Sequence, residues 1–175
     1  MRGEETQIAG YLNDKPNFTG MLCLPGTHSK WVHIKKGKIT DFQTVLTGEL
    51  FDLLTTQSVL KCSISQWDDE IFADAVKHSF STPENMMTSL FSIRASYLLK
   101  GESLGKSKLS GILIGAELAA LKARWETEKT IIIGAGELAR LYCVALSLVG
   151  GTPVAEDVIM MTLSGMKNVY KDLFQ

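Results

Sequence analysis

Residues 20–46 constrain the fold more than any other part of the sequence. A short apolar run at 21–24 is followed by turn-forming residues, and an alternating stretch at 31–34 leads through a second turn into 39–46. Tight turns between short runs of this kind join antiparallel strands. The segment therefore predicts a three-stranded meander.

Beyond the meander, the apolar spacing changes to that of helices. Thr47 is expected to cap a helix whose buried positions include Leu50 and Leu54. Gly111 and Gly115, four residues apart, predict close packing of a helix against a neighbouring element. We expect further helices at about 69–78, from 82 to 101, at 107–125 and at 163–174.

Residues 130–149 give a second strong signal. An apolar strand at 130–133 runs into the turn Gly134-Ala135-Gly136, and a helix is expected over 137–149. A last strand is expected at 154–161. A meander followed by helices interleaved with parallel-type strands is typical of an α/β domain.

Composition excludes several classes of protein. The 175 residues carry a net charge of -1, so no basic surface is expected for nucleic acid or an anionic membrane. The apolar stretches are interrupted by charge, which argues against a membrane-spanning helix. Cys23, Cys62 and Cys143 are widely separated. Their spacing predicts neither a disulfide framework nor a zinc site, and a cytoplasmic location is expected.

The loop at 24–31 is the first candidate binding site. Gly26, Thr27, Ser29 and Lys30 could present backbone N–H groups, hydroxyls and an ammonium group to one phosphate. His28 could donate to the same phosphate or brace the hairpin, and bracing is slightly favoured. A plain surface hairpin is the alternative.

The turn at Gly134 and Gly136 is the second candidate. A strand, a glycine turn and a helix bring a nucleotide against backbone and a helix N-terminus. The same residues match a dinucleotide-binding pattern, with Glu156 and Asp157 where a ribose-binding acid would lie. An NAD(P)-binding Rossmann domain is therefore an alternative, although few residues follow Gly136. A purely structural turn also stays open.

The third candidate is the charged group at the beginning of the sequence. Arg2, Glu4 and Glu5 surround a glycine and could bind a substrate carboxylate and sugar hydroxyls. Three charged residues near a terminus are more often solvated.

Several segments resemble the 2-dehydro-3-deoxygalactonokinase family. They are MRGEETQ at 1–7, LPGTHSKWV at 24–32, residues 41–50 and 94–96, the run at 110–117, and the Gly134 turn. The resemblance covers essentially the whole chain.

This resemblance implies an actin-like ATPase fold, as in the sugar kinase, heat-shock protein and actin superfamily. It also implies ATP and Mg²⁺ as cofactors, and phosphorylation of 2-dehydro-3-deoxy-D-galactonate, a 2-keto-3-deoxy sugar acid, at its 6-hydroxyl. The roles it implies are cofactor binding by Gly26, Thr27, His28, Ser29, Lys30, Gly134 and Gly136, substrate binding by Arg2, and catalysis by Glu4 and Glu5; metal ligands are not identified.

The first phosphate loop of that superfamily, a DxGxT hairpin, has no counterpart in the sequence. We therefore expect residues 1–175 to be a single C-terminal kinase domain. Residues 1–19 would form a segment between domains and 20–175 the core, with the N-terminal domain largely missing. Weak or absent activity of the chain alone is expected, with a homodimer or a separate N-terminal half as partner. A non-catalytic, nucleotide-binding regulatory domain is the alternative function.

Overall fold

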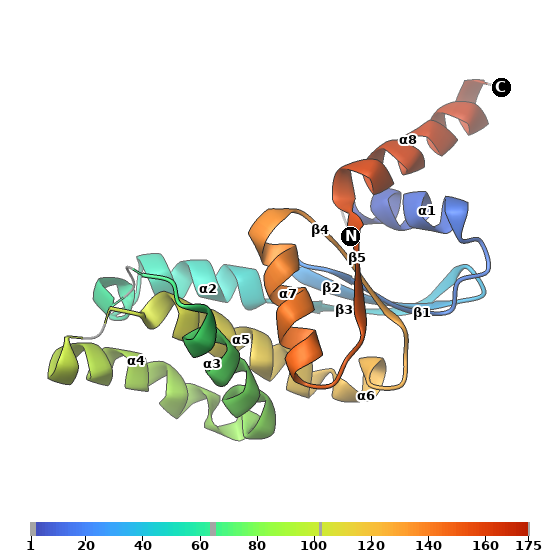
Figure 1. The fold of residues 1–175 in the computed structure, drawn as a ribbon. Coiled ribbons are helices and arrows are strands. Elements are labelled where there is room, and N and C mark those ends of the chain that lie inside the picture. The colour runs from blue at the N-terminus through green and yellow to red at the C-terminus, as the bar shows by residue number, and fades with distance from the viewer. Residues whose placement is uncertain (1–2, 64–65, 102, 175) are drawn as a thin grey trace.

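The computed structural model describes residues 3–63, 66–101 and 103–174, and its centre is a five-stranded sheet in the order β3-β2-β1-β4-β5 (Figure 1). The strands are β1 (Gly20–Leu24), β2 (Ser29–Lys35), β3 (Lys38–Val45), β4 (Thr130–Gly134) and β5 (Pro153–Asp157). β1, β2 and β3 pair antiparallel, whereas β4 and β5 run parallel to β1. The predicted meander and α/β class are confirmed. The alternative of a Rossmann domain is contradicted, because a Rossmann sheet is mostly parallel, whereas three of the five strands here form an antiparallel meander.

Helices cover both faces of the sheet. They are α1 (Glu4–Asp14), α2 (Thr47–Thr56), α3 (Asp69–Ser81), α4 (Met86–Lys100), α5 (Gly105–Ala120), α6 (Lys122–Trp125), α7 (Gly136–Leu148) and α8 (Val158–Phe174), with 3-10 turns at Lys61–Ser63 and Pro83–Asn85. Figure 1 shows α1 and α8 together at one side, and α2 to α5 extending away from the sheet at the other.

The alternation of side chains along β1 divides the core in two. Cys23 points to one face and packs with residues of α3, α5 and α7 such as Phe72 and Leu118. Leu22 points to the other face and packs with Ile8 and Tyr11 of α1. A β-strand presents successive side chains to opposite faces, so β1, which is buried along its whole length, is apolar on both faces.

α1 and α8 touch through their backbones at two glycines. A Cβ atom at Gly10 would lie 1.8 Å from the carbonyl oxygen of Met161, and one at Gly165 would lie 2.0 Å from that of Thr6. No larger residue fits at either position without separating the helices. This contact joins the beginning of the chain to its last helix.

Several predicted boundaries were wrong. The hydroxyl of Thr47 caps no helix, because it donates to Glu117, and Thr47 is the first residue of α2. The last strand ends at Asp157, whose carboxylate accepts from the N–H groups of Ile159 and Met160 and so begins α8.

Two further differences concern helices. The helix expected at 107–125 is divided at Leu121 into α5 and α6. The sequence reading did not predict α1, whose only buried side chains are Ile8 and Tyr11. Three large apolar residues in eleven, Ile8, Tyr11 and Leu12, give a weak helical signal.

Within the described residues, no helix combines the length and the apolar character that crossing a membrane requires.

Gly111→Ala tests the packing of α5 on α3. A Cβ atom there would lie 2.6 Å from the carbonyl oxygen of Phe72 and 2.7 Å from the Cβ atom of Ala75. We expect the free energy of unfolding to fall by about 1–3 kcal/mol, although alanine normally favours a helix. Urea denaturation measures this change. The control Ala120→Val, at an exposed position of the same helix, should change it by less than about 0.5 kcal/mol.

Candidate functional site

A buried carboxylate lies where the sheet, α2, α5 and α7 meet. Glu117 of α5 is 4% exposed. It accepts hydrogen bonds from the indole N–H of Trp31 (2.7 Å), from the hydroxyl of Tyr142 (2.8 Å) and from the hydroxyl of Thr47. Three donors from three other elements therefore converge on one side chain.

Burial and hydrogen bonding act on this carboxylate in opposite directions. Desolvation raises the pKa of Glu117 above its ordinary value of 4.5, and the hydrogen bonds from Thr47, Trp31 and Tyr142 partly oppose that rise. Burial also raises the pKa of Tyr142 well above 10.0, and the nearby charge of Glu117 adds to the rise. Tyr142 is therefore held protonated and can donate.

Ser29 extends the cluster to the predicted phosphate loop. Its side chain is fully buried, and its hydroxyl lies 2.8 Å from that of Tyr142. The end of the loop is thereby fixed to α7. The cofactor contact predicted for Ser29 stays a prediction, since its hydroxyl lies in the core in this structure.

Lys30 and His28 tie the loop to two helices. The buried ammonium group of Lys30 donates to the carbonyl oxygen of His28 (2.7 Å) and lies 3.2 Å from the carboxylate of Glu4 in α1. The imidazole of His28 contacts the carboxylate of Glu49 in α2. In this geometry, His28 braces the hairpin. Phosphate binding by His28 and Lys30 stays a prediction.

Two cavities meet at this loop, and Gly26 and Thr27 line both of them. The first cavity, of about 480 Å³, extends between α2, α5 and α7 and has mostly apolar walls with Lys106 and Glu137 as its charged residues. The second, of about 430 Å³, extends towards α1 and β4. Gly26 and Thr27 therefore form a wall that the two cavities share.

Two helices begin beside the same loop without a side-chain cap. Thr47 and Gly48 at the start of α2 and Glu137 in the first turn of α7 line the first cavity. No side-chain cap hydrogen bond is recorded among the described residues at either N-terminus. At α2, the N–H group of Glu49 donates to the carbonyl oxygen of Thr27 (2.8 Å), so part of that N-terminus is paired with the loop. N–H groups that have no such partner, together with the helix dipole, attract anions.

The glycine turn at 134–136 joins the end of β4 to the start of α7 beside the second cavity. Gly134 lines the second cavity, and Gly136 has a positive φ of 55° as the first residue of α7. A Cβ atom at Gly136 would meet nothing within 4 Å, so the space above the turn is open. The predicted loop and the predicted turn, about 110 residues apart in the sequence, thus lie at the same cavity.

Of the charged residues predicted near the beginning of the chain, only Glu4 is found at a cavity among the described residues. Glu4 lines the second cavity. Glu5 is exposed and does not line it, and Arg2 lies outside the described residues. Over residues 3–63, 66–101 and 103–174, no group of three or more acidic, histidine or cysteine side chains is arranged to hold a metal ion.

Sequence reasoning missed the walls of the first cavity. Trp67, Lys106 and Glu137 line it, and none was predicted as a site residue. Glu137 follows the glycine turn directly and could have been identified from that position. Trp67 and Lys106 come from segments that only the folded chain brings to the loop.

Comparisons with known proteins agree on one family. A family model described as 2-keto-3-deoxy-galactonokinase matches residues 1–169. The protein named Probable 2-dehydro-3-deoxygalactonokinase of Rhizobium meliloti (strain 1021) is 37% identical over 174 residues, which are 95% of this chain and 57% of the relative. The 2-dehydro-3-deoxygalactonokinase of Escherichia coli (strain K12) is 35% identical over 165 residues, with 90% and 55% covered.

A solved structure gives the same result. The crystal structure of a Sinorhizobium meliloti protein assigned to this kinase activity superposes with a TM-score of 0.93 at 32% sequence identity. The match covers 99% of this chain and 60% of that chain. The chain thus spans a little more than half the length of the relatives it matches.

Tyr142→Phe tests the buried cluster. The change removes a hydroxyl that donates to Glu117 and pairs with Ser29. Because both partners are buried, we expect the free energy of unfolding to fall by about 1–3 kcal/mol, as measured by urea denaturation. The control Tyr97→Phe, on the partly exposed Tyr97 of α4, should have a smaller effect; equal losses would contradict the role of the cluster.

The raised pKa of Glu117 predicts a dependence of stability on pH. A carboxyl group whose pKa is higher in the folded state stabilises the fold below its ordinary value of 4.5 and loses that contribution as the pH rises through the raised value. Glu117→Gln carries no such titration. Relative to this variant, the wild-type chain should lose stability as the pH rises above 4.5. A difference in unfolding free energy that stays constant with pH would contradict the assignment.

Proposed function

The chain belongs to the 2-keto-3-deoxy-galactonokinase family, and from that membership we propose that it takes part in the ATP-dependent phosphorylation of 2-dehydro-3-deoxy-D-galactonate at the 6-hydroxyl. The two cavities that share Gly26 and Thr27 are the observation that carries the proposal. A phosphoryl transfer needs a nucleotide and an acceptor on two sides of one phosphate position.

The fold supports a nucleotide-binding role. A three-stranded antiparallel meander continued by two parallel strands is the arrangement expected of an actin-like ATPase domain. We propose that this domain carries the second phosphate loop, at residues 24–31. We also propose that Gly134 and Gly136 contact the nucleotide at its phosphates, since Gly134 lines the second cavity and α7, which begins at Gly136, lines the first through Glu137.

The nucleotide would occupy the first cavity. Its apolar walls suit a nucleobase, and Lys106 and Ser110 offer donors. The phosphates would then reach Gly26 and Thr27, between the N-termini of α2 and α7, which lack side-chain caps. Mg²⁺ bound to the phosphates would neutralise part of the charge that develops during transfer.

The sugar acid would occupy the second cavity. Glu4 lines this cavity, and its carboxylate could accept the proton of the 6-hydroxyl as the oxygen bonds to the γ-phosphorus and the bond to ADP breaks. Lys30, 3.2 Å from Glu4, holds that carboxylate beside the loop. We propose that Arg2 binds the carboxylate of the substrate and that Glu5 assists at the same end of α1.

We also propose that the chain alone has weak or absent activity. Its partner would be a second copy in a homodimer or a separate N-terminal half, and its location would be cytoplasmic. An assay of ATP-dependent phosphorylation of the sugar acid by the purified chain, with and without the remaining part of a relative, tests the first two.

Gly26→Val separates binding from folding. A Cβ atom at Gly26 would meet no atom within 4 Å, and the backbone needs no positive φ there. The larger side chain would occupy the wall that both cavities share. We expect ATP affinity, measured by calorimetric titration, to fall at least about tenfold, while the free energy of unfolding changes by less than about 0.5 kcal/mol.

The matched control is Ala155→Val, which adds a similar side chain at an exposed position of β5 outside both cavities. Its ATP affinity should equal that of the wild-type chain. Unchanged affinity in Gly26→Val would contradict a phosphate site at this loop.

A further inference from the structure

We propose that Asp69, anchored by Arg140, is a positioning residue that holds the indole of Trp67 as the aromatic wall against which the nucleobase stacks. The inference rests on the proposed nucleotide site in the first cavity. It assigns a specific role to three residues of that cavity and its rim.

Trp67 contacts both a buried ring and the first cavity. Its indole ring packs on the buried ring of Phe72, with centroids 5.5 Å apart and an angle of 35° between the planes. The side chain also lines the first cavity. An aromatic side chain that packs on a buried ring and also lines a cavity is suited to stacking on a planar base.

The orientation of this ring depends on Asp69. The indole N–H of Trp67 donates to Oδ1 of Asp69 (2.9 Å). Asp69 is the first residue of α3, two positions after Trp67, so the bond also fixes the chain leading into that helix. The hydrogen bond from Trp67 and the one from Arg140 lower the pKa of Asp69, which keeps this acceptor ionised.

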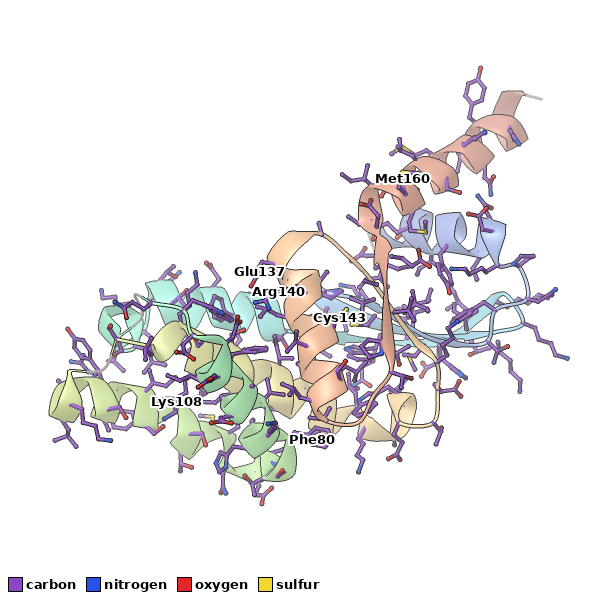
Figure 2. The ribbon with its side chains drawn as sticks, in the orientation of Figure 1. Phe80, Lys108, Glu137, Arg140, Cys143 and Met160 are labelled. Carbon is purple, nitrogen blue, oxygen red and sulfur yellow. The ribbon has the colours of Figure 1, made fainter. Side chains whose placement is uncertain are left out.

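Arg140 connects Asp69 to Glu137, which lines the same cavity from α7. Its guanidinium group lies 3.0 Å from Oδ1 of Asp69, and it binds Glu137 through two hydrogen bonds of 2.9 and 2.6 Å. Figure 2 shows Glu137 and Arg140 together at the start of α7. The group therefore spans from α7 to the segment that carries Trp67.

The ion pair of Glu137 with Arg140 also offsets a negative charge at the cavity wall. Glu137 lines the cavity in which the anionic nucleotide would bind. Its two oxygens both face the guanidinium group of Arg140, which also lowers the pKa of Glu137. Like charges would otherwise oppose the phosphates.

The test compares two ligands on Asp69→Ala. ATP carries the base and the phosphates, whereas inorganic tripolyphosphate carries only the phosphates. Because this variant releases Trp67 and leaves the Glu137–Arg140 pair in place, we expect the dissociation constant for ATP to rise about threefold to fivefold, with that for tripolyphosphate unchanged. Asp69→Asn, which keeps an acceptor for the indole, should fall between Asp69→Ala and the wild-type chain.

Two further variants complete the design. Asp41→Ala removes another exposed aspartate, which pairs with Arg124 at 2.5 Å outside the cavity, and should leave both dissociation constants unchanged. Trp67→Ala should weaken ATP about fivefold or more and again spare tripolyphosphate.

The inference is overturned if Asp69→Ala weakens both ligands equally, as a general loss of structure would, or weakens neither. It is also overturned if Trp67→Ala binds ATP as tightly as the wild-type chain. A wild-type chain that binds tripolyphosphate but gains nothing from the adenosine would likewise contradict it, while leaving the phosphate loop intact. Failure of the wild-type chain to bind either ligand would instead contradict the proposed function.

Discussion

The buried carboxylate of Glu117 is the constraint on which the site depends. An isolated charge inside a protein costs several kcal/mol, so Glu117 is tolerated only while Trp31, Thr47 and Tyr142 all donate to it or while it holds a proton. Each donor belongs to a different element, and each is therefore held in position by the same requirement. The cluster fixes β2, the start of α2 and α7 relative to α5.

The arrangement of the cavities follows from this cluster. Thr47 and Tyr142 donate to Glu117 and also line the first cavity, so the buried network and the binding surface share side chains. Ser29 extends the same network to the end of the loop. The outer side of the loop is held by charge instead, through Lys30 with Glu4. The loop is thus held by polar contacts in a defined position beside two helix N-termini.

Local signals predicted the sheet and the glycine turn, because strand alternation and turn residues act over short distances. The same reasoning failed for Thr47, whose hydroxyl satisfies a carboxylate 70 residues away instead of the start of its own helix. It missed α1 because that helix is stabilised by close backbone contact at Gly10, not by a long apolar face. Glu117 itself carries no sequence signal for burial, since its three donors are distant in the chain.

The central claim is that the phosphates of a nucleotide bind at Gly26 and Thr27, between the N-termini of α2 and α7, with the nucleoside in the first cavity. Calorimetric titration of the purified chain with adenosine, ADP, ATP and NAD tests it most directly. The account predicts that affinity rises from adenosine to ADP to ATP and that NAD binds more weakly than ATP. Equal affinity for adenosine and ATP, or tighter binding of NAD, would contradict it.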